Sequence, residues 1–255
     1  MMTDHWEYYP CQVEDQTAFI FYDHGISETI DDLGIDTFLW LKVPLQTDNG
    51  SGLPLESEFE QLAVIDDLIE EFVEGYDGAY VGRVTAGKAR FFHCYLNVSE
   101  DLVQAFVTQV NEQTGYQTEY LIEEDKNKDH YWADLYPSDE DLHVMRDLKV
   151  MEELEENGDD SSKARRIDHW VYFKTEENLN IFQEWAKEEG FSVESFGKAE
   201  EALHDHAFVL QFYITERPVI EEVSETTAKI VRKAEELDGE YDGWETSVEP
   251  ADPVN

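Results

Sequence analysis

Segments typical of strands and helices follow the same order in each half of this 255-residue chain. In each half an aromatic, β-favouring run precedes an apolar stripe at helical spacing, two further strand-like runs, a second stripe and a last strand. This order, βαββαβ, is that of the ferredoxin-like split βαβ unit. Apolar residues make up 41% of the chain, enough for two cores. We therefore expect an α+β protein of two ferredoxin-like domains.

The first half opens with a strand-like run at 17–25 that lies outside this order. We expect it to be one extra N-terminal strand. The remaining predicted elements are strands at 37–45, 78–87, 88–98 and 116–124, a helix from about Phe59 to Gly75, and a helix from Ser99 to Gly115.

A change of composition after Pro137 marks the boundary between the halves. The following stretch is strongly charged, yet its apolar residues keep helical spacing and Gly158 is a natural helix end. We predict a joining helix at about 139–157 and domains at 1–137 and 138–255. The second half then repeats the order with strands at 167–173, 191–196, 206–214 and 242–248, and helices at 175–190 and 218–234.

The charge balance restricts the partners that the protein can bind. Sixty Asp and Glu residues against 18 Lys and Arg leave a formal charge of -42, which opposes direct binding to nucleic acid phosphates. Three explanations of the acidity stay open: attraction to a basic protein segment, mimicry of a nucleic acid, and solubility alone.

Cysteine usage and hydropathy point to the cytoplasm. Cys11 and Cys94 are the only cysteines and form neither a disulfide framework nor a CxxC motif. The amino-terminal residues lack a signal-peptide pattern, and no run reaches the ~20 apolar residues that cross a bilayer. We expect a cytoplasmic protein without a membrane segment.

The sequence contains no familiar catalytic motif, neither a Walker loop nor GxGxxG, GxSxG or HExxH. Asp125, Asn127 and Asp129 have the opening spacing of a calcium loop, but His130 replaces the required glycine. The His-Asp-His triplet at 204–206 has metal-binding side chains, although such a loop is more often solvated surface. We predict no enzyme activity, no cofactor and no metal.

Asp168 and His169 are neighbours with acid–base potential. Strand alternation places His169 on the face of Val171 and Phe173, which favours a core or edge histidine held by a hydrogen bond over a catalytic base.

Four aromatic residues of the second half suggest a sheet-face platform of the kind that binds single-stranded RNA: Trp170, Tyr172, Tyr241 and Trp244. Such platforms also need basic residues to neutralise phosphate, and these are missing here. We therefore predict no direct binding of nucleic acid.

Three motifs in the second half are ENGDD at 156–160, RIDHWVYF at 166–173 and EYDGWET at 240–246. With them, residues 151–249 resemble the family of regulators of ribonuclease E activity B, RraB. The resemblance implies a ferredoxin-like domain that inhibits a ribonuclease by binding outside its catalytic centre. It offers eight residues as structural or interface positions: Asp160, Asp168, His169, Trp170, Tyr241, Asp242, Gly243 and Trp244.

The first half resembles a domain of unknown function that is often fused ahead of the RraB family. The segments WEYYP at 6–10, YVGRVT at 80–85 and FFHCYL at 91–96 carry this resemblance, which names no activity. The fused domain, and the lack of a long acidic tail, depart from the founding RraB pattern and leave the partner open.

Charge and resemblance together predict a non-catalytic regulator that binds and inhibits a ribonuclease E-like enzyme of RNA decay or another basic protein. One alternative is a ligand-binding or enzymatic first domain, with a pocket formed by Tyr80, Arg83, His93 and Tyr95. A second alternative is an acidic mimic of nucleic acid. The oligomeric state and the role of the first domain stay open.

Overall fold

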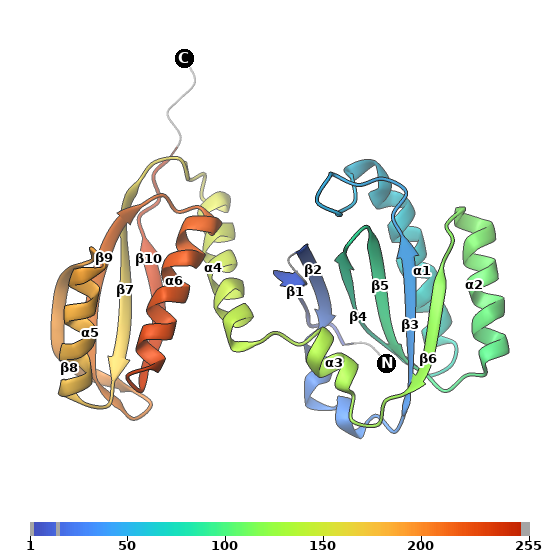
Figure 1. The fold of residues 1–255 in the computed structure, drawn as a ribbon, viewed down its shortest axis with the longest axis horizontal. Coiled ribbons are helices and arrows are strands. Elements are labelled where there is room, and N and C mark those ends of the chain that lie inside the picture. The colour runs from blue at the N-terminus through green and yellow to red at the C-terminus, as the bar shows by residue number, and fades with distance from the viewer. Residues whose placement is uncertain (1–2, 14–15, 251–255) are drawn as a thin grey trace, which may run out of the picture. The chain divides into compact units, whose positions relative to one another are not determined.

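The computed structural model describes residues 3–13 and 16–250. The chain divides into two compact units, Met1–Asp141 and Leu142–Asn255. Each unit packs helices against an antiparallel sheet (Figure 1). The predicted α+β class is therefore confirmed.

The first unit contains a six-stranded sheet in the order β1-β2-β4-β5-β3-β6, and every neighbouring pair is antiparallel. Its main elements are β1 (Trp6–Val13), β2 (Gln16–Asp23), β3 (Thr37–Pro44), α1 (Phe59–Glu74), β4 (Ala79–Ala86), β5 (Ala89–Tyr95), α2 (Glu100–Thr114), β6 (Glu119–Glu124) and α3 (Asp129–Asp134). Short 3-10 helices lie at Gly25–Glu28, Ile30–Asp32 and Glu56–Glu58.

Helices α1 and α2 cover one face of this sheet and fill the core of the unit. Their buried stripes, with Leu62, Ile65 and Ile69 from α1, pack against strand residues such as Leu41 and Phe92. The short helix α3 lies against the other face. There the Tyr131 hydroxyl donates to the Asp23 carbonyl at 2.8 Å, which ties α3 to the end of β2.

The prediction of a single extra N-terminal strand is wrong, because β1 and β2 form a two-stranded hairpin outside the βαββαβ order. The sequence analysis did not predict β1, because Pro10 cannot donate a backbone hydrogen bond and proline is rare in central strands. In the structure β1 is the edge strand, where a missing donor on the outer side costs no ladder bond.

The second unit contains a four-stranded antiparallel sheet in the order β10-β7-β9-β8. Its elements are α4 (Asp139–Glu156), β7 (Arg165–Phe173), α5 (Glu176–Glu188), β8 (Ser192–Leu203), β9 (His206–Glu216), α6 (Ile220–Glu235) and β10 (Gly239–Thr246). The helix predicted at about 139–157 corresponds to α4, and the division between the units falls in its first turn.

The three helices of this unit share one face of the sheet. Leu179 and Phe182 of α5 and Ile230 of α6 pack on Val171 and Phe212. Leu154 of α4 belongs to a smaller cluster with Ile167, Val223 and Trp244. None of the described helices of this unit packs on the opposite face of the sheet.

A β-bulge in β10 decides which residues reach the helices. Tyr241 pairs with Val171 and Gly243 with Trp170, so Asp242 is an extra residue between them. The bulge turns both Tyr241 and Trp244 toward the core, where both are buried. The four-residue aromatic platform is therefore wrong, since only Trp170 and Tyr172 stay on the other face.

Asp147 is a buried carboxylate that joins three elements. It accepts hydrogen bonds from the Trp244 indole at 2.8 Å, the Thr227 hydroxyl at 2.7 Å and the Ser224 hydroxyl at 3.2 Å. Burial raises the pKa of Asp147 above its ordinary value. These bonds fix α4 to α6 and to β10.

We expect Asp147→Ala to destabilise the second unit by about 3 kcal/mol, because it leaves buried donors without an acceptor. Asp147→Asn keeps one acceptor oxygen and should cost less. Native-state hydrogen exchange of the β10 amides measures the effect. The exposed Glu153→Ala on the same helix is the control, and equal protection in all three variants would contradict a role for the buried carboxylate.

Candidate functional site

The candidate site is the helix-free face of the second sheet. Strand alternation in β7 places Asp168, Trp170 and Tyr172 on this face, opposite Tyr213, Gln211 and Val209 of β9. All six side chains are partly exposed. We call this surface the open face.

The motif residues proposed from the sequence divide between the two sides of the sheet. His169, Tyr241 and Trp244 are buried on the helix side. Asp168, Trp170 and Gly243 lie on the open face, and Asp242 is exposed in the bulge. Burial and the charge of Asp242 raise the pKa of Tyr172 above its ordinary value.

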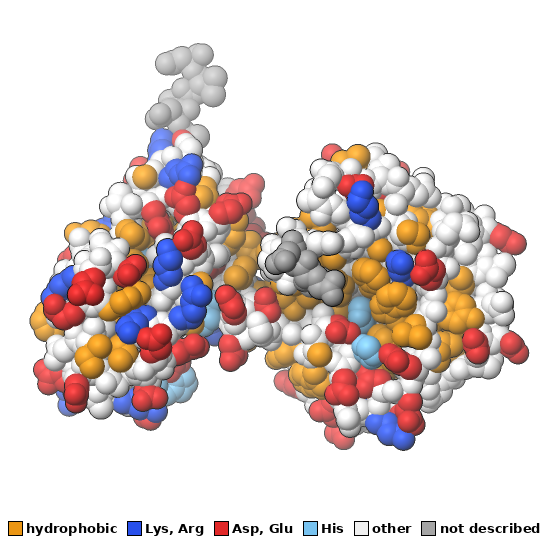
Figure 2. All heavy atoms as spheres, viewed as in Figure 1, with side chains coloured by type: hydrophobic (Ala, Val, Ile, Leu, Met, Phe, Trp, Pro, Cys, Tyr) orange, Lys and Arg blue, Asp and Glu red, His pale blue; other side chains and the backbone are white. Residues whose placement is uncertain are grey.

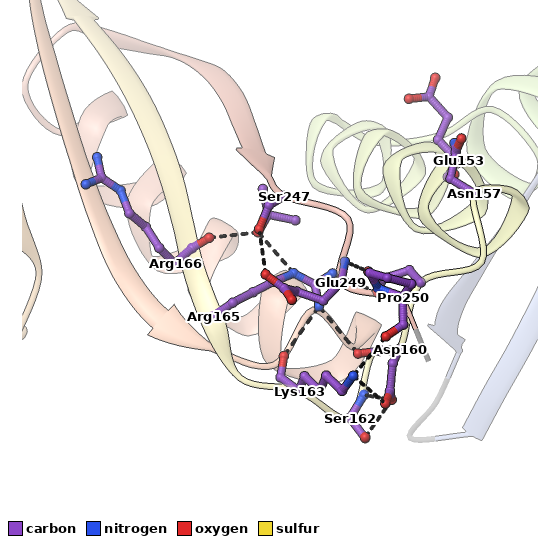
Figure 3. A network of polar contacts seen from close by, with 12 residues as sticks. Glu153, Asn157, Asp160, Ser162, Lys163, Arg165, Arg166, Ser247, Glu249 and Pro250 are labelled. Atoms are coloured by element: carbon purple, nitrogen blue, oxygen red, sulfur yellow. Dashed lines mark hydrogen bonds and ion pairs between the residues drawn. The ribbon is translucent and has the colours of Figure 1, made fainter. Parts of the chain in front are cut away.

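Asp160 belongs to a separate network at the end of β10 (Figure 3). Its side chain accepts hydrogen bonds from the Ser162 amide at 3.1 Å and hydroxyl at 2.6 Å, and its amide donates to the Glu249 carbonyl. The neighbouring Asp159 forms a buried ion pair with Arg165 at 2.7 Å. This part of the ENGDD motif therefore anchors the chain after α4 to the end of the sheet.

His169 is a neutral core residue. Its Nδ1 lies 2.9 Å from the Tyr241 hydroxyl, and its Nε2 has no hydrogen-bond partner among the described residues. Burial lowers the pKa of His169 to about 3. The hydrogen-bonded core histidine expected from strand alternation agrees with this environment.

The open face already binds one guanidinium group of the chain itself. The Arg166 side chain lies 3.9 Å over the Tyr213 ring and donates to both carboxylate oxygens of Asp168 at 2.7 and 2.6 Å. Glu194 adds a second carboxylate at 3.1 Å. An aromatic ring flanked by carboxylates is thus an arginine site here.

Trp170 is a second aromatic residue of the open face, and the exposed Asp242 precedes its cross-strand partner. Across the strands Trp170 faces Gly243, and a Cβ placed on Gly243 would meet no atom within 4 Å. No Lys or Arg of the described residues stacks on Trp170 or forms an ion pair with Asp242. Trp170 is partly exposed and Asp242 is exposed.

The helix side of the second unit has a different character. Figure 2 shows acidic and basic side chains interspersed over α5 and α6. Several of them pair along their own helix, as in Lys229–Glu225 at 2.8 Å and Lys187–Glu184 at 2.7 Å. This is ordinary solvated helix surface.

The structure does not gather the four residues proposed for a pocket in the first unit. Tyr80 pairs with Cys94 across β4 and β5 and points with Arg83 toward α1. Both contact Asp66 of α1, at 3.2 Å and 2.8 Å. His93 and Tyr95 alternate with Cys94 and point to the opposite face, so the set forms two clusters.

The cluster around His93 and Tyr95 lies beneath α3. His130 stacks on Phe38 at 4.0 Å, and its two ring nitrogens lie 2.8 Å from Asp134 and 2.6 Å from Glu123. Burial would lower the pKa of His130, but these hydrogen bonds raise it. Figure 2 shows hydrophobic side chains gathered over β3, β4 and β5 next to histidines on this face.

The acidic residues that resemble a calcium loop serve as a helix cap. The Asp125 carboxylate accepts the Asp129 and His130 amides at 2.9 and 3.1 Å and the Tyr95 hydroxyl at 2.6 Å. In the 204–206 triplet, His204 contacts Glu240 and His206 contacts the Asp238 carbonyl. Within residues 3–13 and 16–250, no group of three or more His, Cys, Asp or Glu residues is arranged to hold a metal ion.

Cys94 is buried and Cys11 is half-buried, and both are free thiols. Among the helices that the structure describes, none is long and apolar enough to cross a membrane.

The fold and surfaces define a two-unit α+β protein whose second unit presents an aromatic and acidic open face. The chain belongs to a family of unknown function, DUF695, whose model matches residues 4–136. Residues 145–246 match the family described as Regulator of ribonuclease activity B, RraB. Both resemblances seen in the sequence, and their order, are confirmed.

Two solved structures are similar to the chain over 84% of its length and 99% of their own. One is a candidate glycine cleavage system transcriptional repressor, with 8% identity and a TM-score of 0.24. The other is an unknown protein from Galdieria sulphuraria, with 11% identity and a TM-score of 0.21. These scores are too low to support an argument. The search of curated proteins gave no match.

Sequence reasoning missed the polar residues that tie elements together. Asp147 has helical spacing with Met151 and Leu154, which is the signal that it lies on the buried side of α4. Arg166 and Tyr213 come from strands that are far apart in sequence, and only the β7–β9 register brings them together.

We expect acidification to destabilise the second unit through His169. Because the folded pKa of about 3 lies below the ordinary 6.5, the unfolded chain binds a proton first as the pH falls. Between pH 7 and pH 5 this costs about 2 kcal/mol of unfolding free energy. Hydrogen exchange of the β7 amides at both pH values measures it, and His169→Gln should remove this part of the pH dependence. An unchanged dependence in the variant would contradict the assignment.

Proposed function

We propose that this protein is a non-catalytic regulator that binds and inhibits an RNA-decay enzyme of the ribonuclease E type, or another basic protein. The match of residues 145–246 to the regulators of ribonuclease activity carries the proposal. We also infer that both units are ferredoxin-like, which their strand orders support.

The binding surface in this proposal is the open face. Its centre is Trp170, a residue type enriched at the energetic centres of protein interfaces. Asp168 lies two residues before it on β7, the exposed Asp242 precedes its cross-strand partner Gly243, and the missing side chain of Gly243 leaves room beside the indole.

A basic segment of the partner suits this surface chemically. The arrangement of Arg166 over Tyr213, with Asp168 as its carboxylate, is the internal precedent. A guanidinium group of the partner would stack on Trp170 and pair with Asp242 in the same manner. Arginine suits this better than lysine, because its planar guanidinium group can stack on a ring and at the same time donate two hydrogen bonds to a carboxylate.

The net charge of -42 supports the same choice of partner. A strongly acidic protein attracts a basic segment over the length of the ionic screening, which raises the rate of encounter. Such attraction weakens as salt is added. The two free thiols suit the cytoplasm, where we place the complex.

We expect the full-length protein to recover a ribonuclease from lysate at low salt and to lose it at high salt. Trp170→Ala should reduce recovery about tenfold or more, as truncation of an interface hot spot does. Phe196→Ala is the matched control, because Phe196 is 59% exposed but lies opposite the core residue Leu210 on the helix side of the sheet.

Inhibition is then tested directly by adding the purified protein to the recovered ribonuclease and an RNA substrate. Slower cleavage with the wild type, and not with Trp170→Ala, is the expected result. A complex that resists salt, or equal recovery by the Trp170 and Phe196 variants, would count against the open face as the binding surface.

A further inference from the structure

Two arginines of the first unit share a single carboxylate. Arg83 of β4 and Arg90 of β5 each donate Nη1 to Asp66 of α1, at 2.8 and 3.0 Å. The Tyr80 hydroxyl donates to the same carboxylate at 3.2 Å. The three charged side chains are only 12% to 24% exposed. Two guanidinium charges therefore face one carboxylate in a largely buried setting.

Arg83 keeps one complete hydrogen-bonding edge free. Its Nε and Nη2 make no hydrogen bond to the described residues, and Nη2 of Arg90 makes none either. The Arg83 side chain is 24% exposed and the Arg90 side chain 12%, so part of each reaches the surface. The Nε and Nη2 edge of arginine is a fork that matches a carboxylate or a phosphate.

This arrangement is unusual for so acidic a unit. Residues 1–141 have only six basic residues: Lys42, Arg83, Lys88, Arg90, Lys126 and Lys128. Two of the six are partly buried on one aspartate, and Glu70 on the next turn of α1 interacts electrostatically with Arg83 without forming an ion pair within the described structure. Only Asp66 is hydrogen-bonded to the two arginines, so an anionic ligand could accept the donors that remain.

An exposed aromatic surface lies on the same side of the sheet as Arg83. The Arg83 side chain lies 4.3 Å over the ring of Phe21, its partner across β2 and β4. Phe19 and Tyr8 face the same side from β2 and β1 and are 42% and 48% exposed. An anion held by Arg83 would therefore have flat apolar surface beside it.

We propose that Arg83 and Arg90 form a binding site for a small ligand that joins an anionic group, carboxylate or phosphate, to an aromatic ring. The anion accepts the fork of Arg83 and Nη2 of Arg90, and the ring lies on Phe19 and Tyr8. This site belongs to the unit of unknown function and is independent of the regulatory role proposed above.

The test is calorimetric titration of the full-length protein with three probes. Phenylacetate carries a carboxylate, phenyl phosphate a phosphate, and phenylacetamide is the neutral counterpart of the first. Saturable binding of one or both anions is expected, and the stronger of the two identifies the anionic group. The amide should bind at least about tenfold more weakly, the loss expected for charged hydrogen bonds.

Substitutions then test whether the probe binds at this site. Arg83→Gln should weaken binding about tenfold or more, whereas Lys42→Gln removes the same charge on the opposite face and should not. Phe19→Ser changes an exposed residue without touching the Asp66 cluster, so it tests the site even if Arg83→Gln fails to fold. Equal binding of the amide, absence of saturation with both anions, or unchanged affinity in Phe19→Ser would overturn the proposal.

Discussion

The β-bulge at Tyr241 to Gly243 fixes what is core and what is surface in the second unit. One inserted residue turns both Tyr241 and Trp244 toward the helices. There the Tyr241 hydroxyl forms a hydrogen bond with His169, and the Trp244 indole donates one to Asp147. The same insertion leaves a glycine opposite Trp170 on the other side of the sheet. The hydrogen bonds that stabilise the core and the space that exposes the indole are thus two results of a single backbone irregularity.

Much of the fold was readable in the sequence because β7 is regular and the helical stripes are uninterrupted. Alternation placed His169 in the core correctly. The proposed pocket failed because the register between β4 and β5, which pairs Tyr80 with Cys94, cannot be predicted from strand alternation, and this register leaves His93 and Tyr95 on the opposite face. Polar core residues were also missed. Asp66 and Asp147 look like ordinary members of charged helices until tertiary contacts assign them buried partners.

Lysine and arginine are scarce in this protein, and their contacts fall into two kinds. With 18 Lys and Arg among 255 residues, each one surrounded by excess acid, most form local ion pairs on the surface. A few are placed against aromatic rings instead: Arg166 on Tyr213 and Arg83 on Phe21. In both units the arginine lies on a sheet surface next to exposed aromatic area. The two surfaces differ in the sign of the charge that they present: carboxylates in the second unit and guanidinium groups in the first.

The edge strand β1 carries Pro10, and the opposite edge, β6, carries Glu119, Glu123 and Glu124. A strand from a second molecule that approached either edge would meet a missing donor or a row of negative charge. The acidity of the chain therefore also protects the sheet from growing into an aggregate. Both edges of the six-stranded sheet therefore carry features that oppose pairing with a further strand, while its two faces are free of this constraint.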